Sequence, residues 1–131
     1  MNSVTIQTAS RTDFVNIDHL INEVIMQTGL MDGIITVFIP HTTAGVTINE
    51  NADPDVVADM AMVLDRMVPW TGHYRHAEGN TAAHVKASMM GSSVQVPVAS
   101  GRLQLGTWQS LFFCEFDGPR TRKVWIKGIS A

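Results

Sequence analysis

The 131-residue sequence has one cysteine and no excess of positive charge. Cys114 lies in the apolar run of residues 111–114 and has no partner for an intramolecular disulfide, so we expect it to be buried as a small hydrophobic group. Nine Lys and Arg stand against 12 Asp and Glu, and the basic residues are scattered except at Arg120, Arg122 and Lys123. The sequence therefore predicts neither a disulfide scaffold nor a nucleic-acid-binding protein.

Long apolar segments are also missing from the sequence. No run approaches the roughly 18 apolar residues of a membrane-spanning helix, and the first residues lack the charged-then-apolar order of a signal peptide. We therefore expect a cytoplasmic protein with no membrane partner. The 45% of hydrophobic residues can supply one core, and no repeat or linker divides the chain, which predicts a single domain over residues 1–131.

The grouping of the predicted elements favours an α+β fold. Alternation at Val4, Ile6 and Thr8 predicts a strand, residues 16–28 have helical spacing, and a β-branched run at 33–39 predicts another strand. Strand patterns then follow one another through the last third of the chain. We predict about seven strands and three helices in one compact domain, with a largely antiparallel sheet.

The second and third helices have recognisable first residues. Asp53 precedes Pro54, a strong helix start, and Asn80 is placed to cap the helix that Gly91 ends. The stripe that includes Met60 in the second helix is wide, which predicts a largely buried helix.

Histidines supply the first candidate site. His76 falls in an irregular segment and His84 on the first turn of the third helix, so the two imidazoles can converge on one point. His41, between two predicted strands, would complete a zinc-type site of three protein ligands, for which His73 is a possible substitute. A hydrogen-bonded structural role is the alternative for each, and His19 is expected to be solvated.

Acidic residues lie close to these histidines in the sequence. Glu50 and Glu78 have no evident structural duty, so either is a candidate for proton transfer or for orienting a metal-ligating histidine. Asn49 and Asn80 add amide groups, although a helix cap explains Asn80 equally well.

Two further pairs of residues suggest a ligand. Arg120 and Arg122 follow a turn and could hold a phosphate or carboxylate, with surface solvation or an ion pair as the alternative. Trp108 and Gln109 could wall a pocket for a flat ring, although core packing explains Trp108 equally well.

Several polar motifs follow one another in a specific order. They are His41-Thr42-Thr43-Ala44-Gly45-Val46-Thr47-Ile48-Asn49-Glu50, Asp53-Pro54, Tyr74-Arg75-His76, Glu78-Gly79-Asn80, Ala83-His84, Leu103-Gln104-Leu105-Gly106-Thr107-Trp108-Gln109 and Asp117-Gly118-Pro119-Arg120-Thr121-Arg122. In this order they resemble the YjbQ family, also called the secondary thiamine-phosphate synthase family, from one end of the chain to the other.

The resemblance implies a β-sandwich-like sheet, a homotrimer and a pocket near a subunit boundary. It implies a metal site at His41, His76 and His84, and donor chemistry favours Zn²⁺, Ni²⁺ or Fe²⁺ over Mg²⁺. It also implies a weak activity that joins a pyrimidine diphosphate to a thiazole phosphate; the alternative is a trimer that binds a metal or a phosphorylated metabolite without catalysis. The expected substrate-binding residues are Thr42, Thr43, Asn49, Asn80, Trp108, Gln109, Arg120 and Arg122.

Overall fold

Two antiparallel sheets form the framework of the molecule. The computed structural model describes residues 1–131, and every strand pairing in it is antiparallel, which confirms the predicted α+β class. The larger sheet has the order β1 (Asn2–Gln7), β8 (Thr121–Ser130), β3 (Gly33–Phe38), β5 (Ser93–Ala99) and β6 (Arg102–Leu103), and the smaller has the order β2 (Asp13–Asn16), β7 (Gln109–Glu115) and β4 (Ala44–Glu50).

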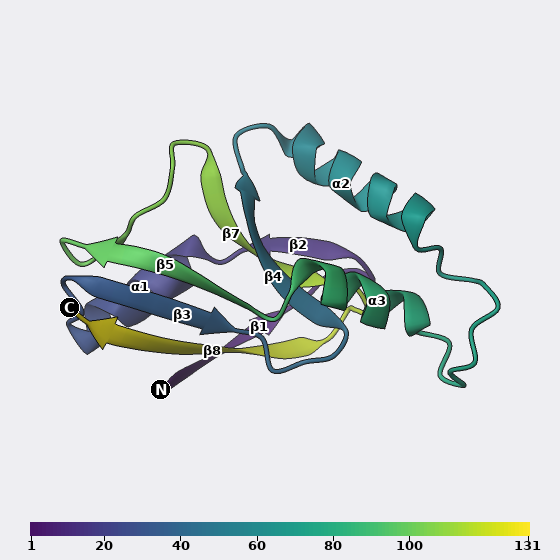
Figure 1. Cartoon of the computed structure of the whole chain (residues 1–131), viewed down its shortest axis with the longest axis horizontal. Coiled ribbons are helices and arrows are strands. Elements are labelled where there is room, and N and C mark those ends of the chain that lie inside the picture. The colour runs from purple at the N-terminus through teal and green to yellow at the C-terminus, as the bar shows by residue number, and fades with distance from the viewer.

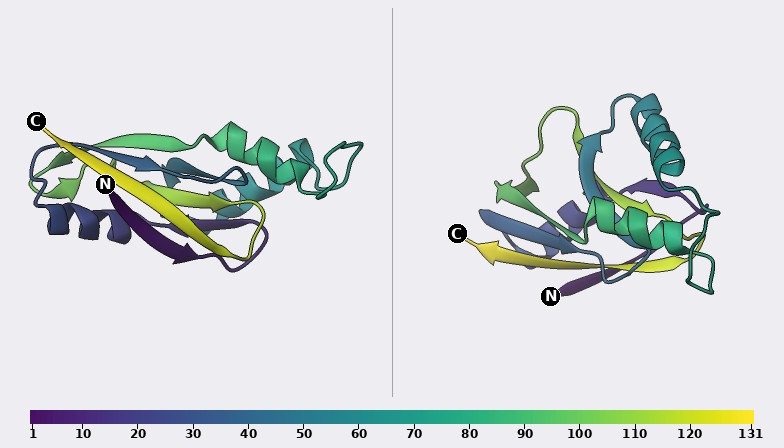
Figure 2. Two further views of the ribbon diagram at one scale, coloured as in Figure 1. Left: turned by 90° about the horizontal axis from the view of Figure 1, so that it is seen from below. Right: turned by 45° about the vertical axis from the view of Figure 1, so that its right-hand side comes forward.

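Three helices pack around the sheets. They are α1 (Asp18–Thr28), α2 (Pro54–Met67) and α3 (Thr81–Met90), and Figure 1 shows α2 at the periphery and α3 beside β4. Seen from below, α1 lies against one face of the larger sheet, while the loop between α2 and α3 projects from the opposite end (Figure 2). None of the three helices has the length and apolar character needed to cross a bilayer.

The core lies between the larger sheet, the smaller sheet and α1. Ile21 and Ile25 of α1, Ile35 of β3 and Phe113 of β7 are at most 1% exposed and belong to one cluster of 17 buried residues. Cys114 is also fully buried, as predicted, and burial raises the pKa of its thiol to about 12. The thiol is therefore protonated at neutral pH and has a packing role.

The prediction that α2 would be largely buried is wrong. Leu64, 7% exposed, is the one buried residue of α2, whereas Met67 is 62% exposed and Val63 is 46% exposed. Its attachment includes a salt bridge from Asp65 to Lys86 of α3, whose side chain is 4% exposed. The wide apolar stripe is thus only partly covered within one chain.

Strand β2 was missed by the sequence analysis, which is why the structure has eight strands in place of about seven. Its four residues contain only Phe14 and Val15 as apolar side chains, too few to produce an alternating pattern. The strand forms because it pairs with residues 112–115 of β7, far away in the sequence.

Helix α3 is held against β4 by a close backbone contact. The Val46 N–H donates to the Gly91 carbonyl at 3.1 Å, and a Cβ added to Gly45 would lie 2.7 Å from the same oxygen. A larger residue at position 45 would push the helix away. This contact sets the position of α3 relative to the segment that precedes β4.

Candidate functional site

A polar pocket of about 450 Å³ lies where four distant segments meet. The segments are the connection from β3 to β4, the loop that precedes α3, the first turn of α3, and the turn that leads into β8. The eleven lining residues, none of them hydrophobic, are Pro40, His41, Thr42, Thr43, His76, Glu78, Asn80, His84, Asp117, Arg120 and Arg122.

The floor of the pocket is a buried ion pair between Arg122 and Glu115. Their side chains are 3% and 0% exposed. Arg122 donates from Nε to Glu115 Oε1 at 2.8 Å and from Nη2 to Oε2, and the same Nη2 donates to Thr43 Oγ1 at 2.8 Å. Glu115 also accepts from the Thr8 hydroxyl at 2.8 Å and from the N–H groups of Phe116 and Asp117 at 3.1 Å.

These contacts determine the charge of Glu115. Burial alone would raise the pKa of its carboxyl, but the hydrogen bonds from Arg122, the Asp117 N–H and Thr8, together with the charge of Arg122, hold the pKa below its ordinary value. Arg122 is therefore paired with a carboxylate at neutral pH. Nε and Nη2 of Arg122 therefore serve the protein, and only Nη1 is left for the anion-binding role that the sequence predicts.

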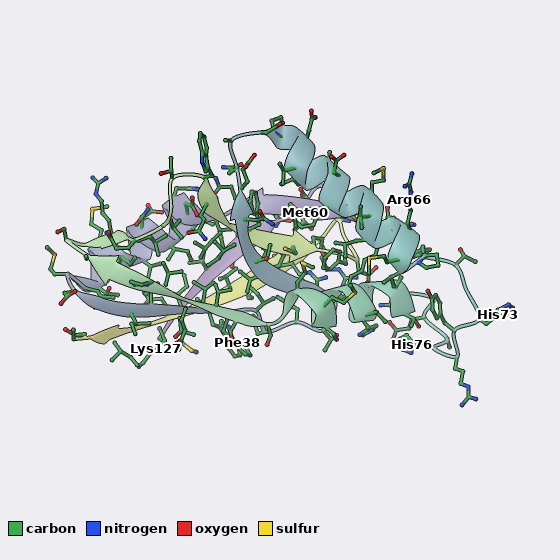
Figure 3. All side chains as sticks on the ribbon, turned by 45° about the horizontal axis from the view of Figure 1, so that its top comes forward. Phe38, Met60, Arg66, His73, His76 and Lys127 are labelled. Carbon is green, nitrogen blue, oxygen red and sulfur yellow. The ribbon has the colours of Figure 1, made fainter.

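His76 and His84 lie together, as their spacing predicted. Their ring centroids are 5.4 Å apart and the rings are nearly perpendicular, at 87°. Figure 3 shows His76 near α3, whereas the proposed substitute His73 lies at the outer tip of the loop, away from that helix. His19 lies on α1 and is exposed, as expected.

His41 lines the same pocket but is already engaged. Its Nε2 accepts a hydrogen bond from the Lys123 N–H at 2.9 Å, which leaves the proton of the neutral ring on Nδ1. Burial, and then the positive charge of Arg122, lower the pKa of His41. No group of three or more His, Cys, Asp or Glu side chains converges in this chain, so the three-histidine centre is not preassembled.

Asn80, Asp117 and Arg120 form one side of the pocket. Asn80 Nδ2 donates to Asp117 Oδ2 at 2.9 Å, and Arg120 donates from Nη2 to the same oxygen at 3.1 Å and from Nε to the Asp117 carbonyl at 3.0 Å. The expected side-chain cap at Asn80 is absent, and its NH₂ group donates to Asp117.

Four predicted site residues lie elsewhere. In the register of β4 with β7, Ala44 is opposite Glu115 beside the pocket, and Glu50 is opposite Gln109 at the other end. Six residues of strand separate the two ends by about 20 Å, and Figure 1 shows the start of β7 and the loop before α3 at different ends of the molecule. The residues placed outside the pocket are Asn49, Glu50, Trp108 and Gln109.

Local contacts engage two of these four residues, Asn49 and Gln109. Asn49 donates to the Met60 sulfur at 3.5 Å and Gln109 accepts from the Gly106 N–H at 2.8 Å. Trp108 is 63% exposed, so it neither packs in the core nor walls this pocket.

Two residues of the site were missed by sequence reasoning. Asp117 had a signal, because it opens the Asp117-Gly118-Pro119 turn next to Arg120. Glu115 had a weaker one: it is the single charged residue within the buried run of residues 110–116. A charge within such a run indicates a buried partner, but the sequence does not say which residue supplies it.

Comparison with known proteins identifies one family over nearly the whole chain. The family model described as UPF0047 protein YjbQ-like matches residues 2–131. The UPF0047 protein YugU of Bacillus subtilis (strain 168) is 49% identical over 128 residues, covering 97% of each chain. A UPF0047 protein of Methanocaldococcus jannaschii is 44% identical over 122 residues, covering 93% of this chain and 88% of the relative.

Two solved structures have the same fold as this chain and related sequences. A YjbQ/UPF0047 family protein from Clostridium acetobutylicum is 50% identical, with a TM-score of 0.96 over 98% of this chain and 100% of that one. A conserved hypothetical protein from Thermus thermophilus is 36% identical, with a TM-score of 0.93 over 98% of this chain and 100% of that one.

We predict that Glu115→Gln destabilises the protein by about 3–5 kcal/mol at pH 7, because the buried guanidinium of Arg122 loses its counter-charge. The native pKa of Glu115 is lowered, so the stability that its charge contributes is present above the unfolded pKa and is lost as pH falls through the native one. The difference in free energy of unfolding between the wild type and Glu115→Gln should therefore narrow below about pH 4.5. Urea denaturation at several pH values measures it.

Glu78→Gln is the matched control, because Glu78 is exposed and should change stability little. A variant at position 115 as stable as the wild type at pH 7 would contradict the role of the ion pair.

Proposed function

The chain belongs to the YjbQ-like UPF0047 family, and we propose that its polar pocket binds a divalent metal ion together with a small phosphorylated molecule. The observation that carries this proposal is the convergence of His76, His84, Arg120 and Arg122 on one pocket without hydrophobic lining. Phosphate oxygens suit guanidinium groups, and imidazole nitrogens suit transition metals.

The arginines supply the anion-binding side. Arg120 uses Nε and Nη2 within the protein, and Arg122 uses Nε and Nη2, so Nη1 of each donates no hydrogen bond to the chain. Both residues line the pocket, and their remaining donors are suited to phosphate oxygens. Glu115 holds Arg122 in place for this role.

The histidine pair has a spacing suited to a shared ion. Two imidazoles that bind one metal at about 2.0–2.1 Å place their ring centres about 5 Å apart, close to the 5.4 Å between His76 and His84. The pair would leave other positions open for water or phosphate oxygens. Of the metals considered, Zn²⁺, Ni²⁺ and Fe²⁺ fit two imidazoles better than Mg²⁺ does.

The same arrangement also supports a more specific proposal, a thiamine-phosphate synthase-like transfer reaction. In that reaction the thiazole phosphate nitrogen forms a bond to the pyrimidine methylene carbon as the bond to diphosphate breaks. A metal ion and the arginines would offset the charge that develops on the leaving diphosphate. Glu78, which lies in the pocket, is a better proton-transfer candidate than Glu50.

A non-catalytic role is the alternative, in which the same cytoplasmic protein binds a metal and a phosphorylated metabolite without turnover. Release of diphosphate from the pyrimidine diphosphate, dependent on the thiazole phosphate, would support the enzyme over the binding module.

Exposed apolar side chains support assembly into a homotrimer. On α2, Met67 is 62% exposed and Val63 is 46% exposed, and on the outer face of the larger sheet Phe38 stacks on Trp125 with ring centroids 5.7 Å apart. Apolar surface of this kind marks contact sites in many proteins.

We expect His76→Ala and His84→Ala each to lose bound metal, because each removes one of two imidazole ligands. His19→Ala, an exposed histidine on α1, is the matched control and should keep the metal content of the wild type. Elemental analysis of untagged protein measures this, and occupancy should fall in acid because a protonated imidazole cannot bind the metal. Retention of metal by both variants would exclude the pair as ligands.

Arg120→Ala should weaken binding of ethyl phosphate about tenfold without changing metal content, since the lost guanidinium contacts the anion. Isothermal titration measures the affinity, and Arg11→Ala serves as a control because Arg11 stacks on Trp70, with its guanidinium carbon 4.1 Å from the ring centroid. Equal affinities for ethyl phosphate in the wild type and Arg120→Ala would remove Arg120 from the site.

Sedimentation equilibrium at micromolar concentration should give three times the mass of the 14.3 kDa chain. Met67→Glu should weaken this assembly by introducing a charge on the exposed face of α2, whereas Asp59→Glu should not. A wild-type protein that sediments as a monomer would refute the homotrimer.

A further inference from the structure

One buried polar atom in the pocket wall has no partner. The Asn80 side chain belongs to a residue that is 9% exposed, and its Oδ1 accepts no hydrogen bond. Its Nδ2 donates to Asp117 Oδ2 at 2.9 Å. A carboxylate only accepts, so this contact places the NH₂ group toward Asp117 and leaves the carbonyl oxygen as the unpaired atom.

The free oxygen is not explained by the helix that Asn80 precedes. An asparagine at this position ordinarily turns its oxygen to the first N–H groups of the helix. Here the N–H groups of Ala83 and His84 donate to the Asn80 backbone carbonyl, at 3.0 and 3.4 Å, and the side chain makes no cap. The large majority of buried polar atoms in proteins are paired with protein groups or ordered water, so an unpaired oxygen on a residue that lines a pocket points to a donor outside the chain.

Two carboxylates line the same pocket as Asn80. They belong to Asp117 and Glu78. Asp117 Oδ2 already receives Asn80 Nδ2 and Arg120 Nη2, so its other oxygen remains to accept. The guanidinium donors without a partner in the chain, Nη1 of Arg120 and of Arg122, belong to the anion-binding side.

We propose that the ligand is a small phosphorylated amine whose amino group donates to Asn80 Oδ1 while its phosphate binds the arginines. An amino group suits this wall better than a hydroxyl, because an ammonium is all donor and its charge is attracted by the carboxylates of Asp117 and Glu78. The inference rests on the phosphate site proposed above and adds the second recognition element, which selects among phosphate esters.

Four probe compounds distinguish recognition of the phosphate from recognition of the amine. O-phosphoethanolamine carries the amine, 2-hydroxyethyl phosphate replaces it by a hydroxyl, ethyl phosphate lacks both, and inorganic phosphate lacks the carbon chain. Isothermal titration of the intact protein should give O-phosphoethanolamine about tenfold tighter binding than ethyl phosphate, the effect of one hydrogen bond with a charged partner. 2-Hydroxyethyl phosphate should lie between them.

Two variants at position 80 isolate the oxygen. Asn80→Ala removes both the oxygen and the contact to Asp117. This variant should bind O-phosphoethanolamine and ethyl phosphate with about equal affinity. Asn80→Asp loses the contact to Asp117 but keeps an acceptor oxygen, so the preference should persist or increase. Thermal unfolding of both variants checks that they are folded.

The outcomes are distinct for the two proposals. If ethyl phosphate binds in an Arg120-dependent manner but the amine gives no preference, the amine inference fails and the phosphate site stands. If both Asn80 variants lose the preference equally, the contact with Asp117 is what matters, and the role of the oxygen is overturned. If neither ethyl phosphate nor inorganic phosphate binds, both proposals fail.

Discussion

The ion pair of Arg122 and Glu115 joins the two sheets at the end of the molecule where the pocket lies. Arg122 belongs to β8 of the larger sheet and Glu115 to β7 of the smaller one. A carboxylate and a guanidinium can be removed from water at this depth only when hydrogen bonds replace the lost hydration. Five donated hydrogen bonds, from Arg122, Thr8 and two backbone N–H groups, meet this requirement for Glu115. The same contacts position the segment at Thr43 and the turn that begins at Asp117.

Much of the fold could be read from local patterns. The helix at residues 18–28 and the strands at 33–38 and 93–99 follow from apolar spacing, because each buries one regular face. The histidine pair was also accessible, since His76 and His84 are eight residues apart on adjoining structure. Strand β2 was not accessible, because its formation depends on β7 and its own four residues carry little pattern.

The rest of the site depended on topology. Glu50 and His41 are near neighbours in the sequence, but β4 lies between them and carries them to opposite ends of a strand. For Asn80, a local rule predicted a cap, but the side chain makes none and its NH₂ group donates to Asp117, a residue 37 positions away. Glu115 shows the same limit, since its partners come from Thr8 just after β1, from β8 and from its own turn. Long-range contacts of this kind leave no trace in residue spacing.

The peripheral position of α2 bears on its local stability. Leu64 is its one buried residue, and Val57, the Asn49 contact to Met60 and the link from Asp65 to Lys86 complete its attachment, so this helix can detach at a smaller free-energy cost than either sheet. Amide hydrogens of α2 would then exchange with solvent while those of β7 remain protected.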